Sequence, residues 1–238
     1  MFRSLAAPFA EICRQKAGIT LNQQQLDQFC QYGELLLEWN QRLNLTAIRE
    51  PWEIMLKHFA DSLLMAKYVK GVDLTDVGTG AGFPGIPLKI VRPELSLVLI
   101  DSLDKRLKFL RALIGVLELE GVELVHARAE DAGKMERFRE RFSTVTARAV
   151  ASLPVLLEYC LPLVKIGGTC LLPKGKKAQE EVREAEHALT VLGGKLDSVE
   201  NFHLAESAEH RSLVIVQKTK TTPAAYPRRA GIPEKKPL

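Results

Sequence analysis

The chain has 238 residues, of which 46% are hydrophobic and 26% are charged. This composition is sufficient for one substantial hydrophobic core and argues against a disordered chain. No apolar run reaches the roughly 18 residues of a membrane-spanning helix. The four cysteines form no C-x-x-C pair and lie in apolar segments, which argues against a disulfide framework. We therefore expect a cytoplasmic protein, a monomer, that does not contact a membrane.

The net charge of +4 is concentrated near the C-terminus. Residues 217–238 carry six basic residues and one acidic residue, so the preceding residues sum to −1. A basic end of this kind is either a solvated, frayed segment or a contact with nucleic acid. The prolines and Tyr226 within "AAYPRRAGIPEKKPL" favour an extended segment that can lie along a phosphate backbone. We treat residues 219–238 as a basic C-terminal tail.

Residues 1–70 are predicted to form a helical N-terminal extension. Thr20, followed by Gln23 three residues later, has the spacing of a capping box at the start of a long helix. Apolar residues then recur at roughly helical spacing. A second long helix is predicted to begin near Pro51, with an apolar face suited to packing against a neighbour.

From residue 72, short β-branched or leucine-rich runs alternate with amphipathic stretches, which predicts a parallel sheet with crossover helices. The predicted strands lie near residues 72–77, 96–101, 122–126, 143–148 and 168–173. The predicted helices lie at about residues 84–91, 104–119, 131–141, 153–164 and 176–192.

Two further strand-like runs, "KLDSVENFH" and "RSLVIVQKT", are joined by a polar turn rather than a helix, so the last strand should run antiparallel. A final antiparallel hairpin is typical of methyltransferase folds. We therefore predict an α/β, Rossmann-like fold over residues 71–218, of the class I S-adenosylmethionine-dependent methyltransferase type. Its sheet is expected to have seven strands, most of them parallel.

The stretch "DVGTGAGFPG", which begins at Asp76, fits two cofactor motifs. In the register that starts at Gly80, it matches the G-x-G-x-x-G fingerprint of nicotinamide or flavin enzymes. In the register that starts at Asp76, its Gly78, Gly80 and Gly82 match the acid-x-Gly-x-Gly-x-Gly loop that usually holds S-adenosylmethionine. Both cofactors use glycine for close backbone approach and a helix N-terminus beyond the turn, so the glycines alone leave both open.

The neighbours of the glycines favour S-adenosylmethionine. An acid at Asp76 suits the ammonium group of that cofactor, whereas it repels the pyrophosphate of NAD; capping of the loop backbone is the alternative role. Asp101 ends the second strand, where an acid takes ribose hydroxyls in either cofactor. Ala129 and Glu130 follow the third strand, beside the expected adenine. Glu130 either accepts the adenine amino proton or begins a helix.

Several stretches together resemble one family: "LNLTAI", "KHFADSL", "DVGTGAGFPGIPLKI", "IDSLDKRLKFL", "HARAED", "ARAVASLPVLLEYCLPL" and "YPRRAGIPEKKPL". From about residue 40 to the C-terminus, the chain resembles the bacterial glucose-inhibited division protein B family, whose members methylate N7 of a guanine in small-subunit ribosomal RNA. The resemblance implies S-adenosylmethionine as cofactor. It also implies 16S rRNA as partner, in the small ribosomal subunit or an assembly precursor, with guanine 527 as target by family analogy.

The resemblance also implies site residues. Together with the glycine motif it gives these cofactor-binding candidates: Asp76, Gly78, Gly80, Gly82, Phe83, Asp101, Ser102, Ala129, Glu130 and Arg148. Arg148 ends the fourth predicted strand and is the candidate catalytic residue; without the family, a surface salt bridge at a strand end is the simpler interpretation.

Methylation of N7 needs no general base, because this atom carries a lone pair and no proton. Proximity and orientation should therefore supply most of the acceleration. Cys160 and Cys170 lie in apolar stretches, unlike an exposed nucleophile, and are assigned to the core. His58 and Asp61 share one helix face, but no third ligand accompanies them. We expect an interhelical hydrogen bond or a contact with the cofactor loop there, and no metal.

RNA is expected to be held largely through its phosphates. The candidate contacts are Lys174, Lys176, Lys177, Arg228, Arg229, Lys235 and Lys236, with Lys105 and Arg106 as further cations. For "PKGKK" the alternative is a helix start with solvated lysines. Three other functions stay open: a methyltransferase of a small molecule or protein, an NAD-linked oxidoreductase, and a regulatory protein that binds S-adenosylmethionine.

Overall fold

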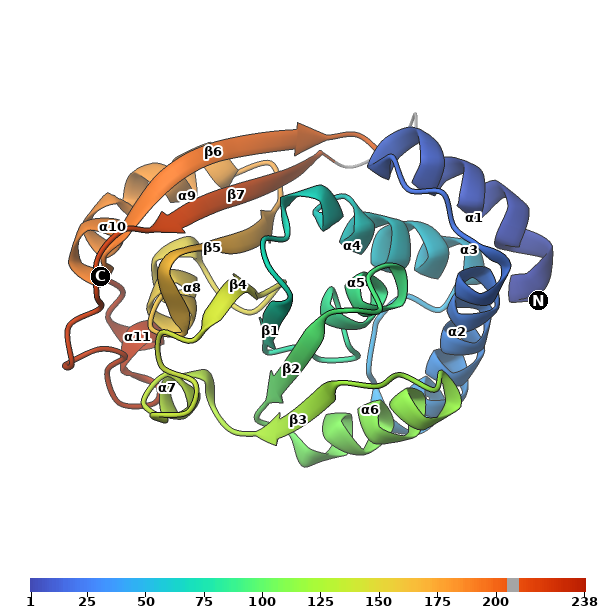
Figure 1. Cartoon of the computed structure of the whole chain (residues 1–238), viewed down its shortest axis with the longest axis horizontal. Helices are drawn as coiled ribbons and strands as arrows, with labels where there is room; N and C mark the ends of the chain where they lie inside the picture. Colours follow the sequence, from blue (N-terminus) through green and yellow to red (C-terminus); the bar gives the residue numbers. More distant parts are fainter. Residues whose placement is uncertain (205–209) are drawn as a thin grey trace.

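The protein, as a computed structural model, is described for residues 1–204 and 210–238, and the strands in this part form one seven-stranded sheet in the order β3-β2-β1-β4-β5-β7-β6 (Figure 1). The strands are β1 Asp73–Val77, β2 Ser96–Asp101, β3 Val122–His126, β4 Phe142–Thr146, β5 Val164–Lys174, β6 Gly194–Phe202 and β7 Arg211–Lys218. Strands β1 to β5 are parallel, and β7 is antiparallel to β5 and β6. The predicted fold class is confirmed. The polar turn expected between the last two strands falls largely on residues 205–209, outside the described residues.

The strand order places a ligand site. β1 pairs with β2 on one side and with β4 on the other, so the crossovers that leave β1 and β4 diverge at this point. In open parallel sheets, ligands bind at the carboxyl ends of the strands where the order reverses. The carboxyl ends of β1 and β4 are therefore the expected position of the site.

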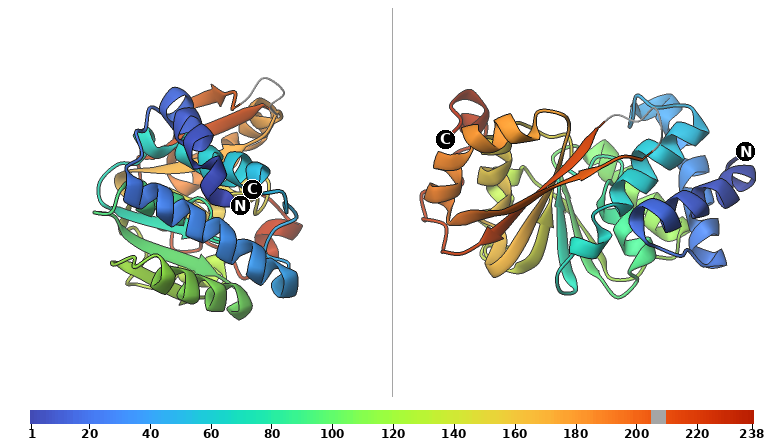
Figure 2. Two further views of the ribbon diagram at one scale, coloured as in Figure 1. Left: turned by 90° about the vertical axis from the view of Figure 1, so that its right-hand side faces the viewer. Right: turned by 90° about the horizontal axis from the view of Figure 1, so that it is seen from above.

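Helices cover both faces of the sheet (Figures 1 and 2). Those after β1 are α5 Gly85–Val91, α6 Asp104–Val116, α7 Ala129–Ala132, α8 Leu153–Cys160, α9 Ala178–Glu184 and α10 Glu186–Leu192. The helix predicted over residues 176–192 is thus two helices that meet at Ala185, which is fully buried.

The prediction of a helix over residues 131–141 is wrong. Only the single turn α7 forms, and the chain then continues through turns. Gly133, which follows α7, lies against the C-terminal residues: a Cβ at this position would be 2.9 Å from Cγ of Pro227. A side chain therefore does not fit at the residue that follows α7, which is a tertiary contact that the helical spacing of the sequence does not reveal.

The N-terminal helices precede the sheet. They are η1 Phe2–Leu5, α1 Ala6–Ile12, η2 Cys13–Ala17, α2 Gln23–Leu43, α3 Pro51–Ile54, η3 Met55–Ala60, α4 Asp61–Leu63 and η4 Ala66–Tyr68. The capping box predicted at Thr20 is wrong by two residues. Asn22 caps α2, since its side chain accepts from the backbone N–H of Gln25 and the Gln25 side chain accepts from the backbone N–H of Asn22. Thr20 precedes this turn and is exposed.

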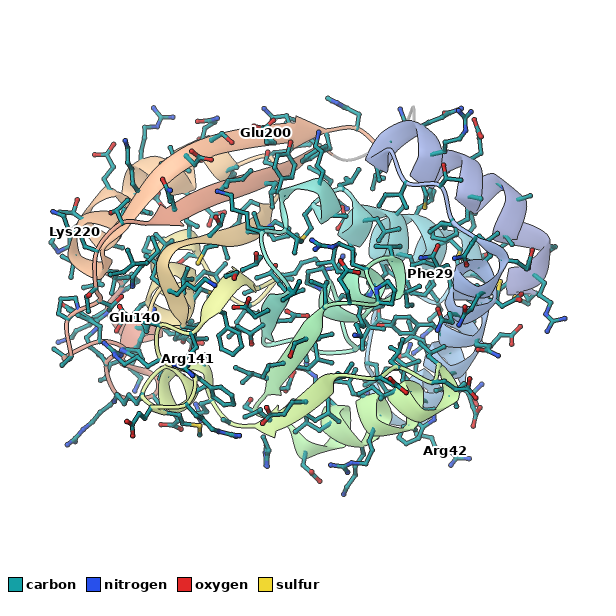
Figure 3. The ribbon with its side chains drawn as sticks, in the orientation of Figure 1. Phe29, Arg42, Glu140, Arg141, Glu200 and Lys220 are labelled. Atoms are coloured by element: carbon teal, nitrogen blue, oxygen red, sulfur yellow. The ribbon has the colours of Figure 1, made fainter. Side chains whose placement is uncertain are left out.

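The N-terminal helices share their apolar core with the sheet domain. Phe9, Phe29 and Phe59 are fully buried and belong to the cluster that includes Phe109 of α6. Figure 3 marks Phe29 on α2 among the N-terminal helices, and Trp39 of the same helix contacts Phe109 of α6 at 5.8 Å between ring centres. Tyr32 of α2 donates a hydrogen bond to the carbonyl of Ala81, in the loop after β1. The helices therefore contact the segment that builds the ligand site.

The C-terminal segment, residues 219–238, packs on the sheet domain at the end opposite the N-terminal helices and does not extend into solvent (Figures 1 and 2). It includes the short helix α11 Ile232–Lys235 and contacts α8. The extended tail expected from its prolines is therefore wrong. Within the described residues, no helix combines the length and apolar character needed to cross a bilayer. All four cysteines are buried and unpaired, as predicted.

Candidate functional site

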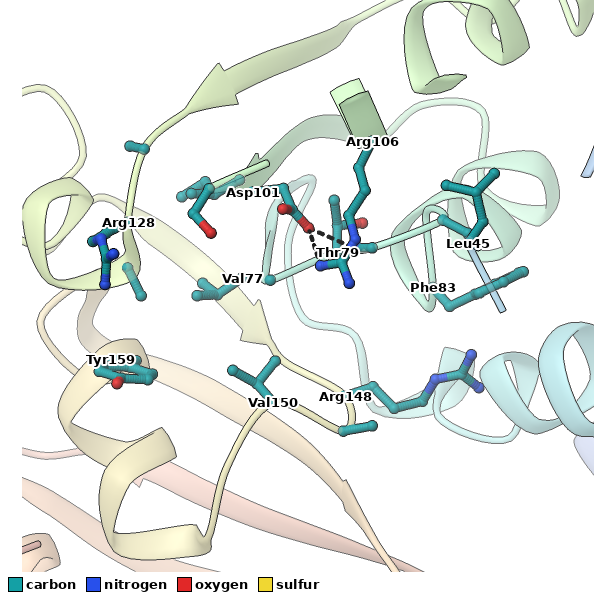
Figure 4. A pocket seen from close by; sticks show the side chains of 18 of the residues that line it. Leu45, Val77, Thr79, Phe83, Asp101, Arg106, Arg128, Arg148, Val150 and Tyr159 are labelled. Carbon is teal, nitrogen blue, oxygen red and sulfur yellow. Dashed lines mark hydrogen bonds and ion pairs between the residues drawn. The ribbon is translucent and has the colours of Figure 1, made fainter. Parts of the chain in front are cut away.

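A cavity of about 450 Å³ opens at the carboxyl ends of the central strands. Its floor is formed by the loop after β1, and its walls by the segments after β2, β3 and β4. Figure 4 shows Arg128 and Tyr159 at one end of this cavity and Leu45, Phe83 and Arg148 at the other. The cavity lies at the position that the strand order predicts.

Eight of the ten cofactor candidates line this cavity. They are Gly78, Gly80, Phe83, Asp101, Ser102, Ala129, Glu130 and Arg148. The other two, Asp76 and Gly82, are not among its lining residues. The structure thus brings together residues from four separate strand ends, and it places two members of the glycine motif behind the loop.

The glycine loop is shaped by close contacts on both of its sides. Gly78 has a φ of 68°, and a Cβ there would lie 2.7 Å from Val150. Gly82 has a φ of 98°, and a Cβ there would lie 2.7 Å from the Tyr32 hydroxyl. Both positions therefore require glycine. The absence of a side chain at Gly78 allows the loop to contact Val150, which lines the cavity, and its absence at Gly82 allows Tyr32 of the N-terminal helices to approach the loop.

Asp76 is fully buried beneath the loop. Its Oδ2 accepts from the Thr79 hydroxyl at 2.7 Å and from the backbone N–H of Gly85 at 2.9 Å. Its Oδ1 has no partner among the described residues, and burial raises the pKa of the carboxyl to about 6. The geometry agrees with the alternative role considered for Asp76, in which it holds the loop backbone.

Asp101 at the end of β2 faces the cavity but is already well bonded. Oδ2 accepts from the backbone N–H of Gly80 at 2.9 Å and from Arg106 at 3.2 Å, and Oδ1 accepts from the backbone N–H of Leu103 at 2.9 Å. A carboxylate offers about four acceptor directions, so about one remains for a ligand hydroxyl. Asp101 therefore both fixes the loop and keeps limited capacity for a ligand.

The other end of the cavity contains residues that the sequence did not suggest as cofactor contacts. Tyr159 on α8 and Gly231 and Glu234 of the C-terminal segment line it together with Ala129 and Glu130. We call these five residues the β3 end of the cavity. The local sequence carries no signal for this grouping, because its members come from three distant parts of the chain.

Arg148 is held by three groups from the N-terminal helices. Its guanidinium donates to Asp61 Oδ2 at 2.9 Å, to His58 Nδ1 at 3.2 Å and to the Lys57 carbonyl at 3.3 Å. The guanidinium also lies 5.0 Å from the centre of the Phe83 ring, and Figure 4 shows it directed towards that ring. The strand-end salt bridge considered from sequence is therefore present, but it faces the cavity and is largely buried.

His58 is a neutral group at this end of the cavity. Its ring stacks on Phe83 at 4.5 Å, and burial, with a further contribution from the nearby Arg148 charge, lowers its pKa to about 3. Arginine only donates hydrogen bonds, so Nδ1 of His58 is an acceptor. The neutral ring then carries its proton on Nε2 and donates to the Thr46 hydroxyl at 2.7 Å. His58 thus stacks on Phe83 of the cofactor loop, which is one of the two structural roles expected for it from the sequence.

A second cavity of about 550 Å³ adjoins the first. His58, Arg148 and Ala149 line both cavities, so they form the partition between them. Ala149 has a φ of 56°, a strained conformation for a residue with a Cβ, and such strain clusters at functional sites. Beyond the partition, the second cavity has apolar walls at Ile48, Ala151 and Pro173, with cations at Lys57, Lys174 and Arg211.

The seven basic candidates fall into two groups. Lys174 donates to Glu181 at 2.7 Å and to the Ala151 carbonyl at 2.8 Å, and Arg228 pairs with the buried Glu158 at 2.6 Å. Both are committed within the protein, so we do not retain them as RNA contacts. The exposed ones are Lys176, Lys177, Arg229, Lys235 and Lys236. Among residues 1–204 and 210–238, no group of three or more His, Cys, Asp or Glu side chains is arranged to hold a metal ion.

The fold and this site define a class I S-adenosylmethionine-dependent methyltransferase. Solved structures with the same fold include TYW2 of Pyrococcus horikoshii in complex with MeSAdo (TM-score 0.54, 14% identity, 68% of this chain and 63% of that one). Another is the 16S rRNA (adenine(1408)-N(1))-methyltransferase of Catenulisporales acidiphilia (TM-score 0.51, 17% identity, 66% of this chain and 90% of that one).

Sequence comparison gives the family. The family described as rRNA small subunit methyltransferase G matches residues 25–214. Ribosomal RNA small subunit methyltransferase G of Desulfitobacterium hafniense is 54% identical over 95% of both chains, and that of Acetivibrio thermocellus is 50% identical over 93% of this chain and 92% of its own. The chain belongs to the rRNA small subunit methyltransferase G family. This confirms the resemblance found in the sequence and excludes the NAD-linked oxidoreductase.

The residues of the first cavity fit S-adenosylmethionine. Its volume is within the roughly 300–1,000 Å³ of small-molecule sites. The backbone of the glycine loop is open to close approach at Gly80, where a Cβ would meet no atom nearer than 4.0 Å, and Asp101 keeps an acceptor direction where a ribose lies in such folds. The β3 end is the predicted position of the adenine, since Ala129 and Glu130 follow the third strand, and the end at Phe83, His58 and Arg148 is left for the methionine portion.

Proposed function

We propose that this protein transfers the methyl group of S-adenosylmethionine to N7 of a guanine in 16S rRNA, within the small ribosomal subunit or an assembly precursor. The main support is that His58 and Asp61, at the Arg148 end of the cavity, already form hydrogen bonds with neighbouring side chains. Among the described residues there, both ring nitrogens of His58 and both carboxylate oxygens of Asp61 have partners. A site without a free base suits an acceptor atom that carries no proton.

Methyl transfer to an amine, hydroxyl or amide would need a group to take the departing proton. Asp61 does not fit this role, because its two oxygens accept from Arg148 and Arg211, each at 2.9 Å. His58 does not fit it either, since burial and then the neighbouring guanidinium disfavour its protonated form and lower its pKa. N7 of guanine avoids the requirement, because methylation there releases no proton.

The chain's own residues contribute position and exclusion of water. When bound, S-adenosylmethionine would supply a methyl group on a positively charged sulfur. The lone pair of N7 would form the new N–CH3 bond as the S–CH3 bond breaks, with neutral S-adenosylhomocysteine as the leaving group. Arg148, fixed by Asp61 and His58, sets the partition between the two cavities. Phe83, stacked on His58, closes the side towards the N-terminal helices. Holding the acceptor in line in this way is worth up to roughly 7–11 kcal/mol.

The second cavity is the proposed entry for the acceptor base. Its apolar walls suit the face of a purine, and Lys176 and Lys177 directly follow Gly175 at its border. Arg229 and Lys235 flank the lining residues of the first cavity on the C-terminal segment. Exposed cations at both borders support an RNA loop as substrate, because phosphate contacts position a strand while one base enters the site. A small-molecule substrate would leave these cations without a role.

The test uses methyl-labelled S-adenosylmethionine and small ribosomal subunits from cells that lack this gene. After digestion of the rRNA, we expect label in 7-methylguanosine from the wild-type protein. Arg148→Ala should lower kcat/KM by about a hundredfold, the loss expected when a positioning group is removed. Arg141→Ala, at an exposed arginine that directly precedes β4 and does not line the cavity, is the matched control and should keep wild-type activity. Label in another nucleoside, or none in rRNA, would overturn the proposal.

A further inference from the structure

The C-terminal segment is attached to the domain by charged and backbone groups at three successive points. At the first, Arg139 donates to the carbonyls of Thr222, Pro223 and Tyr226 at 2.8, 3.2 and 2.9 Å. Glu140 accepts from the backbone N–H of Thr222 at 2.7 Å. The start of the segment is thereby fixed to the loop that precedes β4.

The second attachment is a buried ion pair. Glu158 on α8 has no exposed surface, and its carboxylate accepts from the Arg228 backbone N–H at 2.8 Å, from Nε at 2.9 Å and from Nη2 at 2.6 Å. A buried carboxylate is tolerated only when it is paired, so Glu158 specifies where Arg228 lies. This contact joins residues that are 70 positions apart in the chain.

The third attachment is at the cavity itself. The backbone N–H of Gly231 donates to Glu130 Oε1 at 2.8 Å, and Glu130 is buried. Tyr159, next to Glu158 on α8, has its hydroxyl 3.5 Å from Glu234. Gly231 and Glu234 both line the cavity, so the segment forms part of its surface rather than lying behind it.

We propose that the C-terminal segment is the wall that closes the adenine end of the cofactor cavity, and that Glu158 is the positioning residue that holds this wall through Arg228. The wall lies next to Glu130, whose carboxylate accepts from Gly231 of the segment and also lines the cavity. The inference rests on the cofactor of the proposed function and not on its RNA substrate. The C-terminal segment, whose sequence resembles an RNA-binding tail, thus belongs to the adenine recognition site.

The test measures binding of S-adenosylhomocysteine to the full chain by calorimetry in the absence of RNA. Glu158→Gln keeps the side-chain size but removes the charge that orders Arg228, and we expect binding at least tenfold weaker. Glu184→Gln, an exposed glutamate on α9, is the matched control and should bind within twofold of wild type. Arg228→Lys, which keeps the charge but loses the planar fork, should retain more affinity than Arg228→Ala.

A second ligand tests whether weaker binding by Glu158→Gln comes from a displaced wall at the adenine or from general destabilisation of the protein. The analogue of S-adenosylhomocysteine with hypoxanthine in place of adenine lacks the amino group that Glu130 can recognise. Wild type should prefer the adenine ligand, and Glu158→Gln should lose at least fivefold of that preference. A preference equal to that of wild type would overturn the inference, whatever happens to the two affinities.

A third measurement needs only the wild-type chain. Trypsin cleaves after exposed basic residues, and Arg229 in the segment is exposed. Saturating S-adenosylhomocysteine should slow cleavage at this position at least tenfold, because the ligand packs against the wall. Equal cleavage rates with and without the ligand would overturn the inference. If the wild type binds no S-adenosylhomocysteine, the cofactor assignment fails with it, whereas the identity of the RNA acceptor is tested separately.

Discussion

The N-terminal helices and the C-terminal segment are both additions to the sheet domain, and they lie at opposite ends of the molecule (Figure 1). The helices are attached by apolar side chains: Phe9, Phe29 and Phe59 are fully buried in a cluster shared with α6. The segment is attached through the guanidinium groups of Arg139 and Arg228, and its partly buried Tyr226 and Leu238 pack against a second apolar cluster. Each addition contacts one end of the same cavity.

This difference suits the two ends of the site. Apolar burial is non-directional and spread over many residues, so it joins the helices to the sheet domain through many contacts at once, and Tyr32 and His58 extend these contacts to the glycine loop. Charged hydrogen bonds are directional and few, and such regions open locally at lower free energy than a core does. The comparison therefore predicts a rigid methyl-transfer end and an adenine end that can admit and release the cofactor.

The largest effect should come from the apolar attachment. Phe59→Ala removes a fully buried ring that contacts Phe9, Phe29, Tyr32 and Phe83. We expect the free energy of unfolding to fall by about 3–5 kcal/mol. Chemical denaturation measures it, with Ile166→Ala, at a residue that is 58% exposed, as a control within about 0.5 kcal/mol of wild type. A loss below about 1 kcal/mol would contradict an attachment through the core.

Next in size is the polar attachment. Arg139→Ala removes the donor to three carbonyls of the C-terminal segment, and we expect a loss of about 2–3 kcal/mol. Amide hydrogen exchange should accelerate in residues 219–238 and remain unchanged in α2, because the opening is local. Arg137→Ala, at an exposed pair with Glu123, should cost under about 1 kcal/mol. Faster exchange throughout the N-terminal helices would show that the two attachments are not independent.

A smaller effect concerns pH at the N-terminal end. The folded-state pKa of His58 is lowered to about 3, mainly by burial, so the folded protein keeps a neutral ring while the unfolded chain takes up a proton below about pH 6.5. The stability gained from this neutral ring is therefore present above pH 6.5 and is lost as the pH falls. Asp76, with its pKa raised to about 6, acts in the opposite direction and loses its contribution as the pH rises.

The pH effects of His58 and Asp76 on stability have opposite signs. Each is therefore measured as the difference in the free energy of unfolding between wild type and the corresponding variant. The stability of wild type minus that of His58→Gln should fall by about 1–2 kcal/mol between pH 6.5 and pH 5. The same difference for Asp76→Asn should rise as the pH falls through this window. Thermal unfolding across the pH range measures both, and a pH-independent difference for His58→Gln would contradict a buried neutral imidazole.

The smallest effect on stability is expected at the exposed cations of the C-terminal segment. Replacing Arg229, Lys235 and Lys236 with alanine should change the free energy of unfolding by less than about 0.5 kcal/mol, since all three are exposed. Binding to the small subunit should nevertheless weaken. The slope of log K against log salt should fall by about 0.7 for each phosphate that the protein no longer neutralises. An unchanged slope would remove these cations from the RNA surface while leaving the segment's attachment intact.

Much of the cavity could be predicted because its signals are local. Strand ends, glycine positions and the acids at Asp101 and Glu130 follow from short-range patterns, and the structure places them in one cavity. Asp76 shows the limit of such reasoning. Its position in the motif is right, but whether the carboxylate faces a ligand or the loop depends on side-chain direction, and it bonds Thr79 and Gly85. Gly82 likewise fits the motif but serves the contact with Tyr32.

By itself, the sequence determined the order of the elements, the fold class, the family and the residues that end each central strand. These depend on hydrophobic period and turn chemistry, which act over a few residues. Only the tertiary structure decided which charged groups face ligands and which face each other. The pairs Glu158–Arg228 and Asp61–Arg148 join residues 70 and 87 positions apart, and no local pattern specifies a partner at that separation. The basic tail therefore became a wall of the cavity through pairing that the fold alone establishes.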